Sequence, residues 1–369
     1  MTVAVLGGGP AGAMAAARLA SAGARVVVLE RDTAPSDKVC GDFLSIEAQA
    51  AAADLGIDLV GLGAAPIRTV RLHHARRVAE AVLPFPALGL SRRRLDAALL
   101  DAAAARGAEV RRGVRALALR PDGVDTSAGS LRAKTVFLAT GKHDLRGAAR
   151  PAASASWVGF KTYLLLAPAQ AARLRGSVEL VLFSGGYAGL LTVEDGSANL
   201  SLIVAAERLA AAGGGWDGLL RWLVATCPIL ADRLAGAAEL RARPLAVARL
   251  PYGFLHTPAV GETAWRVGDQ MAVIPSLTGD GVALALHTAE QAVAAWRAGR
   301  RAEAHHAALA RSLRGQMRRA GWLHRVCLSA SAPGAVVVAA GWLPALVRVA
   351  AVATRIAMPS SSVMVKTYE

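Results

Sequence analysis

Apolar residues near the start of the chain form two short runs separated by a helical segment. Thr2–Leu6 and Arg25–Glu30 are almost continuously apolar, which is typical of strands buried on both faces of a sheet. The Ala-rich segment between them, residues 11–22, favours a helix that Gly23 ends. The pattern predicts a strand–helix–strand unit.

The same mixed pattern continues as far as residue 150. A helix is expected from about residue 91 to Gly107, followed by candidate strands at 114–119 and 134–139. From residue 157 the pattern becomes that of consecutive strands joined by Gly-containing turns, with strands expected at 178–183, 190–193 and 199–204.

A mixed pattern returns at 265–274 and in a helix expected over 281–298, and the pattern after that is helical. The chain therefore predicts an α/β domain interrupted by a sheet-rich substrate domain and followed by C-terminal helices. The expected boundaries are 1–70, 91–150 and 261–300 for the α/β domain, 71–90 and 151–260 for the sheet-rich domain, and 301–369 for the helical region.

Composition narrows the class of protein. The 369 residues are 54% hydrophobic and 19% charged, which excludes disordered, collagen-like and coiled-coil chains. Only three cysteines are present, which fits a reducing compartment, and no basic segment precedes the first apolar run, so we expect a cytoplasmic protein.

The chain is strongly basic, with 42 Lys and Arg against 27 Asp and Glu, a net charge of +15. Such an excess suits anionic partners, but it is also what the Ala-, Gly- and Arg-rich bias of a GC-rich genome produces. Both explanations stay open. Basic residues are scattered and not interleaved with base-stacking aromatic residues, so no nucleic-acid partner is expected.

The first predicted strand leads directly into a G-x-G-x-x-G motif. Gly7 permits a tight turn, Gly9 allows close approach of a pyrophosphate, and Gly12 allows the helix to pack closely on the strand. Glu30 ends the second strand, where a carboxylate can accept hydrogen bonds from a ribose. This context predicts a dinucleotide-binding site at the N-terminus of the first helix.

The order and spacing of several short motifs resemble those of FAD-dependent oxidoreductases, and in particular of the aromatic hydroxylases (group A flavin monooxygenases) and the geranylgeranyl reductases. The motifs occupy residues 7–12, 30–31, 91–96, 139–141, 268–269, 275 and 279–281. The resemblance implies FAD as cofactor and a Rossmann-type, glutathione-reductase-like domain with an inserted substrate domain. The residues that it assigns to FAD are Gly7, Gly9, Pro10, Ala11, Gly12, Glu30, Arg31, Cys40, Gly41, Arg92, Thr140, Gly141, Gly268, Asp269, Pro275, Gly279, Asp280 and Gly281.

Two further segments bear on the chemistry. Residues 38–45 are similar to the K-x-C-G segment of geranylgeranyl reductases, which lies close to the flavin ring, and Cys40 is therefore a candidate catalytic thiol or a packed small side chain. The segment 185–202 resembles that family's substrate-lining strands but lacks their Trp and Phe-Pro. Tyr187 in this segment is a candidate polar contact to substrate or a structural residue.

The reaction itself is open between three hypotheses. We favour oxygen-dependent hydroxylation of a hydrophobic, phenolic or polyketide-type small molecule; the alternatives are ene reduction of an isoprenoid or lipid chain, and a flavoprotein that modifies or partners another protein. NAD(P)H is the expected external reductant, although Lys142, His143 and Arg146 stand where hydroxylases carry an Asp-Gly motif.

No metal site is expected, because the His73-His74 and His305-His306 pairs have no acidic or thiol ligand at metal spacing.

The pattern of residues 309–325 predicts a basic amphipathic helix, with Arg311, Arg314, Arg318 and Arg325 on one face. An uncharged run follows at 332–347, interrupted by two prolines and shorter than the ~20 apolar residues of a spanning helix. We expect these helices to cover the substrate cavity or, in addition, to rest on an anionic membrane as a peripheral contact.

Overall fold

A parallel five-stranded sheet organises the first domain. The computed structural model describes residues 2–150, 157–329 and 331–356. The strands of this five-stranded sheet run in the order β17-β10-β1-β2-β6. They are β1 (Thr2–Leu6), β2 (Arg25–Glu30), β6 (Glu109–Arg112), β10 (Thr135–Leu138) and β17 (Trp265–Arg266).

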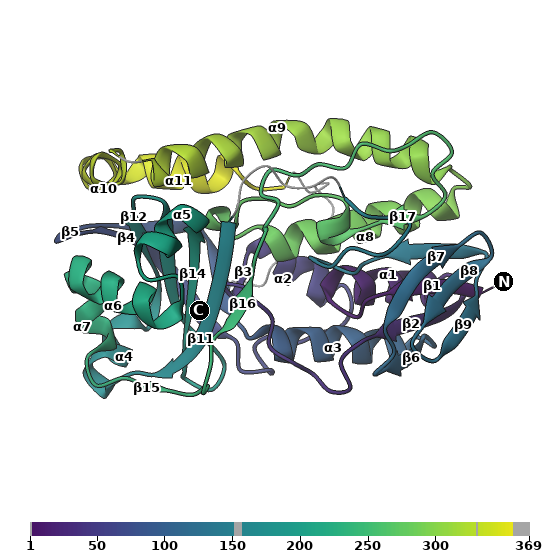
Figure 1. Ribbon diagram of the computed structural model, residues 1–369, viewed down its shortest axis with the longest axis horizontal. Helices are drawn as coiled ribbons and strands as arrows, with labels where there is room; N and C mark the ends of the chain where they lie inside the picture. Colours follow the sequence, from purple (N-terminus) through teal and green to yellow (C-terminus); the bar gives the residue numbers. More distant parts are fainter. Residues whose placement is uncertain (1, 151–156, 330, 357–369) are drawn as a thin grey trace.

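Both faces of this sheet are covered, which explains the continuous apolar runs of its strands. Val3 and Val5 pack against helices, whereas Ala4 and Leu6 pack against a small antiparallel sheet. The helices are α1 (Pro10–Ser21), α3 (Arg92–Ala105) and α8 (Gly281–Arg297), and the small sheet consists of β7 (Ala116–Arg120), β8 (Gly123–Thr126) and β9 (Gly129–Arg132). The result is a three-layer domain (Figure 1).

The second domain is built on a nine-stranded sheet, mostly antiparallel, that lies beside the first domain along the long axis (Figure 1). Its path is β15-β11-β14-β13-β12-β4-β5-β3, with β16 paired to β11. The strands are β3 (Phe43–Leu44), β4 (Ala65–His74), β5 (Arg77–Gly89), β11 (Trp157–Leu165), β12 (Gly176–Phe183), β13 (Gly186–Thr192), β14 (Ala198–Ala205), β15 (Ala238–Glu239) and β16 (Leu245–Val247).

The two faces of this large sheet have different neighbours. On β11, Phe160 and Leu164 belong to an apolar core with the helices of one face, while Lys161 and Tyr163 point to the opposite face, as the period-two alternation of a strand requires. The helices around the first face are α4 (Pro168–Leu174), α5 (Ala206–Ala211), α6 (Trp216–Thr226) and α7 (Pro228–Leu234). The opposite face therefore carries the residues that meet the first domain.

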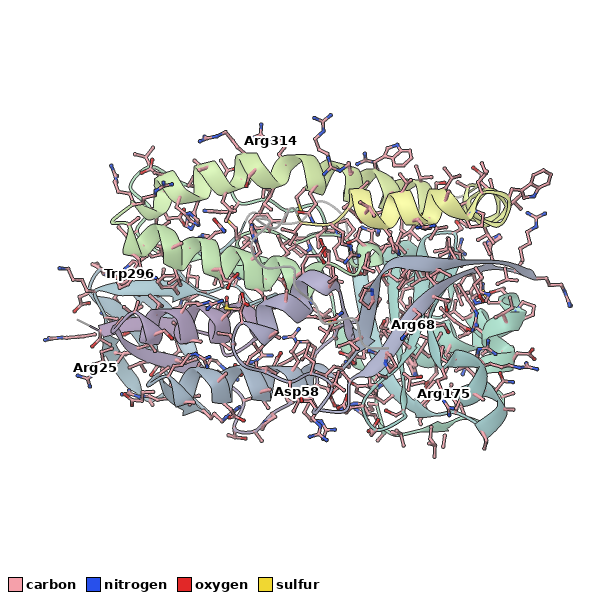
Figure 2. The ribbon with its side chains drawn as sticks, turned by 180° about the vertical axis from the view of Figure 1, so that it is seen from behind. Arg25, Asp58, Arg68, Arg175, Trp296 and Arg314 are labelled. Carbon is pink, nitrogen blue, oxygen red and sulfur yellow. The ribbon has the colours of Figure 1, made fainter. Side chains whose placement is uncertain are left out.

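The C-terminal helices cover one long side of the molecule. Helix α9 (Ala302–Leu328) extends over both domains, and α10 (Pro333–Trp342) and α11 (Pro344–Ala353) lie against β5 (Figure 1). The predicted basic face of α9 is confirmed: Leu309, Leu313, Met317 and Ala320 are buried, and the four arginines are exposed. Figure 2 shows Arg314 projecting outward from this helix.

The predicted mixed α/β architecture with a parallel sheet and a larger sheet-rich region is confirmed. The segment 265–274 adds less regular structure than expected, because Gly268 adopts a positive φ of 59° and ends the strand after Arg266. Strands β4 and β5 begin at Ala65 and Arg77, and short α2 (Ile46–Ala53) precedes them. The expected helical region ran to residue 369, of which 330 and 357–369 lie outside the described residues.

Candidate active site

The glycine loop after β1 allows no side chain at two positions. A Cβ at Gly7, whose φ is 108°, would lie 2.4 Å from the Ala139 carbonyl oxygen. A Cβ at Gly12 would lie 1.8 Å from the Gly7 oxygen. Glycine therefore lets the start of α1 approach β1 and β10 closely, while Pro10 and Ala11 form its first turn.

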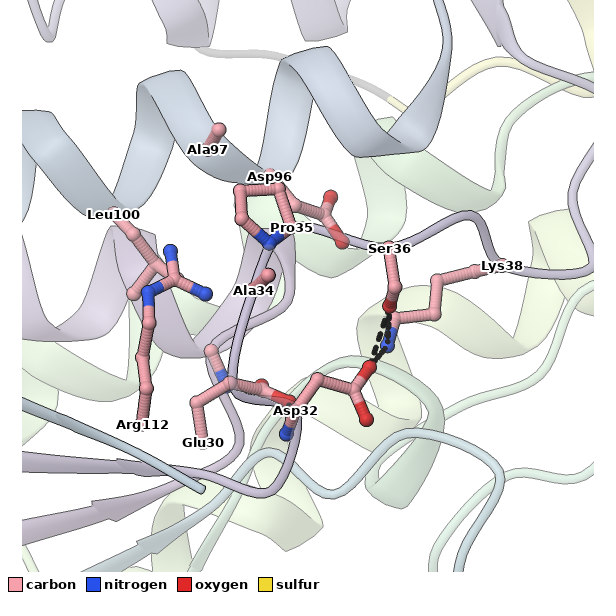
Figure 3. Close-up of a pocket in the computed structure, with 11 residues that line it drawn as sticks. Glu30, Asp32, Ala34, Pro35, Ser36, Lys38, Asp96, Ala97, Leu100 and Arg112 are labelled. Carbon is pink, nitrogen blue, oxygen red and sulfur yellow. Dashed lines mark hydrogen bonds and ion pairs between the residues drawn. The ribbon is translucent and has the colours of Figure 1, made fainter. Parts of the chain in front are cut away.

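Glu30 ties this loop to the end of β2. Its Oε2 accepts a hydrogen bond of 2.7 Å from the Gly8 N–H, and its Oε1 accepts one of 2.9 Å from the Asp32 N–H. The carboxylate borders a small pocket in which Lys38 contacts Asp32 and Ser36 (Figure 3). The pocket lies where the resemblance places the ribose of the cofactor, and Arg31 stands exposed outside it.

Of the three consecutive arginines that begin α3, Arg92 faces the glycine loop. Its guanidinium lies 3.4 Å from the Cβ position of Gly9 and binds the Asp96 carboxylate through two hydrogen bonds of 2.7 and 2.8 Å. Burial opposes the charged form, but the Asp96 charge outweighs it and raises the pKa of Arg92 above its ordinary value. The side chains of Arg93 and Arg94 are 53% and 55% exposed, so Arg92 is the cation available to a phosphate.

These groups fit FAD. No side chain caps the N-terminus of α1, so its first N–H groups are free to bind a pyrophosphate, and a permanently charged guanidinium stands beside them. Glu30 supplies the acceptor for ribose hydroxyls. Together they form the donor and acceptor set that a dinucleotide requires.

The second expected cofactor segment is held close to the loop after β10. The Gly268 N–H donates to Thr288 Oγ1 at 2.8 Å, and the Asp269 carboxylate stays partly exposed, 3.8 Å from Lys142 Nζ. The Gln270 amide donates to the carbonyl oxygens of Gly141 and His143 at 2.9 and 3.0 Å, while the Thr140 hydroxyl also donates to His143. The structure thus brings residues 140–143 beside Asp269.

The side chain of Asp280, which we expected to contact FAD, points toward the C-terminal segment instead. Its carboxylate is fully buried and faces the C-terminal segment, accepting hydrogen bonds from Gln316, Arg355 and the Ile356 N–H. Burial raises its pKa to about 7, although Arg355 opposes this shift. From residues 279–281, only the backbone is therefore available to contact a cofactor. Gly281 begins α8, and Pro275, which precedes this segment, is buried.

The segment around Cys40 lies across the inner face of the large sheet and is anchored there by Asp42. Asp42 Oδ2 accepts hydrogen bonds from Lys161 Nζ at 2.6 Å, Tyr163 Oη at 2.7 Å and Asn199 Nδ2 at 2.7 Å. The side chains of Asp42 and Lys161 are both 0% exposed. Burial raises the pKa of Asp42, and the Lys161 charge opposes that rise.

This anchor brings Cys40 onto the surface that also carries Tyr187. Asn199 donates a second hydrogen bond of 3.1 Å to the Cys40 carbonyl, and Gly41 lies over Ser201 on β14. Tyr187 lies on the adjacent strand β13 of the same face. Lys38 binds Asp32 and Ser36, so its charge is directed away from the thiol and toward the pocket of Figure 3.

Three hydroxyl groups converge beside this segment. Ser276 Oγ is 2.6 Å from Tyr187 Oη and 2.7 Å from Tyr252 Oη, and we call Tyr187, Tyr252 and Ser276 the hydroxyl cluster. Burial raises the pKa of both tyrosines well above the ordinary value, so both keep their protons at neutral pH. Sequence reasoning missed Tyr252 and Ser276, for which no motif gives a signal.

A second group outside the expected site joins His256, Glu262 and His306. Glu262 Oε2 lies 2.7 Å from His256 Nε2 and 3.5 Å from His306 Nδ1, close enough together to hold a metal ion. However, His306 Nε2 accepts a hydrogen bond of 3.0 Å from the Arg266 N–H, which in neutral histidine leaves the proton on Nδ1. A protonated Nδ1 has no lone pair to offer, so His306 can become a metal ligand only by losing this proton.

Comparison with known proteins agrees with this geometry. Residues 1–136 match the FAD binding domain family. The chain is 27% identical over 317 residues to a menaquinone reductase of Mycolicibacterium smegmatis, an alignment that covers 78% of this chain and 74% of that protein.

Solved flavoproteins share the fold of most of the chain. The flavin-dependent brominase Bmp2 superposes with a TM-score of 0.75 at 18% identity, covering 89% of this chain and 87% of that one. The myxobacterial chondrochloren halogenase CndH gives 0.73 at 21% identity (89% and 82% covered), and a flavoprotein/dehydrogenase of Cytophaga hutchinsonii gives 0.72 at 16% identity (89% and 88%). The FAD-binding sequence of residues 1–136, the dinucleotide cradle and this fold together support an FAD-dependent oxidoreductase of the superfamily that includes the aromatic hydroxylases.

Proposed function

We propose that this enzyme reduces an apolar small molecule of the isoprenoid or quinone type. The observation that carries the proposal is the hydroxyl cluster, which holds three exchangeable protons beside Cys40 among apolar side chains. Hydride addition to a carbon–carbon double bond or a quinone carbonyl must be completed by a proton. Where water is excluded, a side chain has to supply that proton.

The roles of the residues follow from their contacts. Reduced FAD, when bound, supplies the hydride. Tyr187 donates the proton to substrate, and Ser276 returns a proton to Tyr187 from Tyr252 along the two short hydrogen bonds. Tyr252, which is only half-buried, regains its proton from solvent. Cys40 borders the same space. Apolar side chains, including Leu250, Leu277 and Cys327, surround Tyr187 and keep it buried, whereas Ser276 is exposed to solvent.

The relationship to a menaquinone reductase supports the same class of reaction, since menaquinone is an apolar quinone. Ene reduction was the alternative among our expectations from sequence, motivated by Cys40 and Gly41. The hydroxyl cluster adds a proton source to this motif.

Oxygen-dependent hydroxylation, which the sequence favoured, is the second candidate. It is supported by the likeness in fold between most of the chain and flavin-dependent halogenases and by the retained Gly268, Asp269 and Pro275. For either reaction we propose NAD(P)H as the external reductant. Lys142 and His143 offer basic groups near Asp269 for its phosphates.

The test is product analysis in the strict absence of oxygen. Chemically reduced holoenzyme is mixed with menaquinone, and the product is examined by mass spectrometry. The proposal requires a product that has gained two hydrogens; a product formed only after oxygen is admitted, and one oxygen heavier, would establish hydroxylation instead.

Variants connect this product to the hydroxyl cluster. Tyr187→Phe and Ser276→Ala are expected to slow single turnover by about 10²-fold or more, the usual contribution of a positioned proton donor. Cys227→Ala is the control, because Cys227 is buried in the core on the other face of the sheet. Equal rates for Tyr187→Phe and the control would remove Tyr187 from the reaction.

A further inference from the structure

The C-terminal helix pair exposes an apolar face. Trp342 is 84% exposed, and Leu343, Leu346, Val349 and Val352 are between 49% and 63% exposed. These five residues are called the α10–α11 face. The opposite side of α11, with Val347 and Ala351, packs against the large sheet, so the helix is attached by one side and uncovered on the other.

Helices α10 and α11 pack on the side of β5 that carries Ala79 and Ala81, so the exposed Val78 and Val82 point to the other side of that strand. On α9, Trp322 is 60% exposed. An exposed apolar surface such as the α10–α11 face is uncommon on a monomer and marks a contact with a partner or a membrane.

The charge around the face is of one sign. Residues 304–356 contain no Asp or Glu, whereas exposed arginines occur at 311, 314, 318, 319, 325 and 348. Among the described residues, no acidic side chain pairs with Arg314, Arg318, Arg325 or Arg348. Exposed tryptophans beside unpaired arginines are typical of a helix that lies in the interface of an anionic bilayer.

The geometry of the helices agrees with lying on a bilayer. Within residues 2–150, 157–329 and 331–356, no single helix is long and apolar enough to cross a membrane; only α9 and α10 taken together reach that length and composition, and they are bent by 107°. A second copy of the chain would bring its own arginines against the same face and is opposed by charge.

The α10–α11 face is also linked to the candidate active site. At the end of α11, Arg355 donates to Asp280 at 3.1 Å and to the Thr278 carbonyl at 2.6 Å, in the turn that contains Ser276. Val336 and Val337 of α10 belong to the same apolar cluster as Tyr187. The helix pair therefore lies between the exposed face and the hydroxyl cluster.

We propose that this enzyme docks on an anionic phospholipid bilayer through the α10–α11 face, with its apolar side chains below the headgroups and the arginines of α9 and α11 at the lipid phosphates. An apolar substrate then enters from the lipid. This last clause rests on the proposed function, whereas the docking itself does not.

The test is flotation of the full-length holoenzyme with vesicles of phosphatidylcholine, with and without phosphatidylglycerol. We expect binding that requires the anionic lipid and weakens with salt. Arg318→Glu/Arg348→Glu should lower the partition coefficient by at least about tenfold, since each basic residue near a charged surface contributes about fivefold.

A triple variant tests the apolar contribution. Trp342→Ser/Leu346→Ser/Val349→Ser should abolish binding, while Val60→Ser/Leu117→Ser/Val260→Ser, which alters three exposed apolar residues elsewhere, should bind like the wild type. Flavin content and circular dichroism check that each variant is folded.

Three results would overturn the proposal: no binding of the wild-type protein at low salt, equal binding by both triple variants, or a dimer without vesicles that only the α10–α11 variant disrupts. Because flotation uses no substrate, its outcome is independent of the anaerobic product analysis. Failure of one therefore leaves the other standing.

Discussion

Replacing Lys161 by methionine should destabilise the protein more than any exposed substitution of the same kind. Lys161 Nζ lies 2.6 Å from Asp42 Oδ2, and neither side chain is exposed. Methionine fills a similar volume but leaves Asp42 as a buried carboxylate with only the Tyr163 hydroxyl and the Asn199 amide on the same oxygen. The segment that carries Cys40 loses its charged anchor.

The expected loss of stability depends on two opposing contributions, the attraction between the two charges and the cost of removing both from water. With an effective dielectric constant near 20, charges 2.6 Å apart attract by about 6 kcal/mol. Desolvation of both groups offsets much of this, but removing one partner leaves the other without compensation and costs about 3–5 kcal/mol. Lys161→Met/Asp42→Asn removes both charges, so its loss should be smaller than the sum of the single losses by at least about 2 kcal/mol.

Urea unfolding followed by circular dichroism measures these free energies, with Lys134→Met as the control because Lys134 is exposed. A loss below about 1 kcal/mol for Lys161→Met, or additive losses in the double variant, would show that the Asp42–Lys161 pair does not anchor this segment.

Three further predictions concern the cofactor site and its surroundings. Arg92→Met should weaken FAD binding by about 10- to 100-fold in a fluorescence titration of the apoprotein, because a charge-assisted contact to phosphate is lost, whereas exposed Arg93→Met should change it little; equal effects would contradict the assignment. Gly12→Ala should yield protein without bound flavin, since its Cβ would lie 1.8 Å from the Gly7 oxygen, and a normal flavin spectrum would contradict this. Burial raises the pKa of Asp280 to about 7, so between about pH 4 and pH 7 the folded protein holds a proton that the unfolded chain has released. Its free energy of unfolding should therefore decline across that range by at most about 4 kcal/mol, and Asp280→Asn should remove this decline; parallel pH profiles of both proteins would count against it.

The elements that depend on residues close together in the sequence could be predicted. The strand, turn and helix around Gly7 and Gly12 follow from apolar runs and from glycines at fixed spacing, and both occur as expected. The amphipathic pattern of α9 likewise predicted its buried and exposed faces. These features arise from periodicity, which a single sequence displays directly.

Contacts between distant segments could not be predicted in this way. Asp42 and Lys161 are 119 residues apart, and Tyr187 and Ser276 are 89 apart, so nothing in their immediate sequence indicates either pairing. The resemblance assigned Arg92 to the cofactor, but the residues alone do not distinguish it from Arg93 and Arg94, because that depends on how α3 packs against the glycine loop. Asp280 was assigned to the cofactor because its motif is local, while Arg355, which binds its carboxylate, comes from the far end of the chain.

The most direct test of the proposed reduction is to mix the chemically reduced holoenzyme rapidly with menaquinone in the complete absence of oxygen and to follow the flavin absorbance. We expect the oxidised flavin spectrum to return at a rate that depends on menaquinone concentration and falls in Tyr187→Phe. A flavin that stays reduced until oxygen is admitted would contradict it.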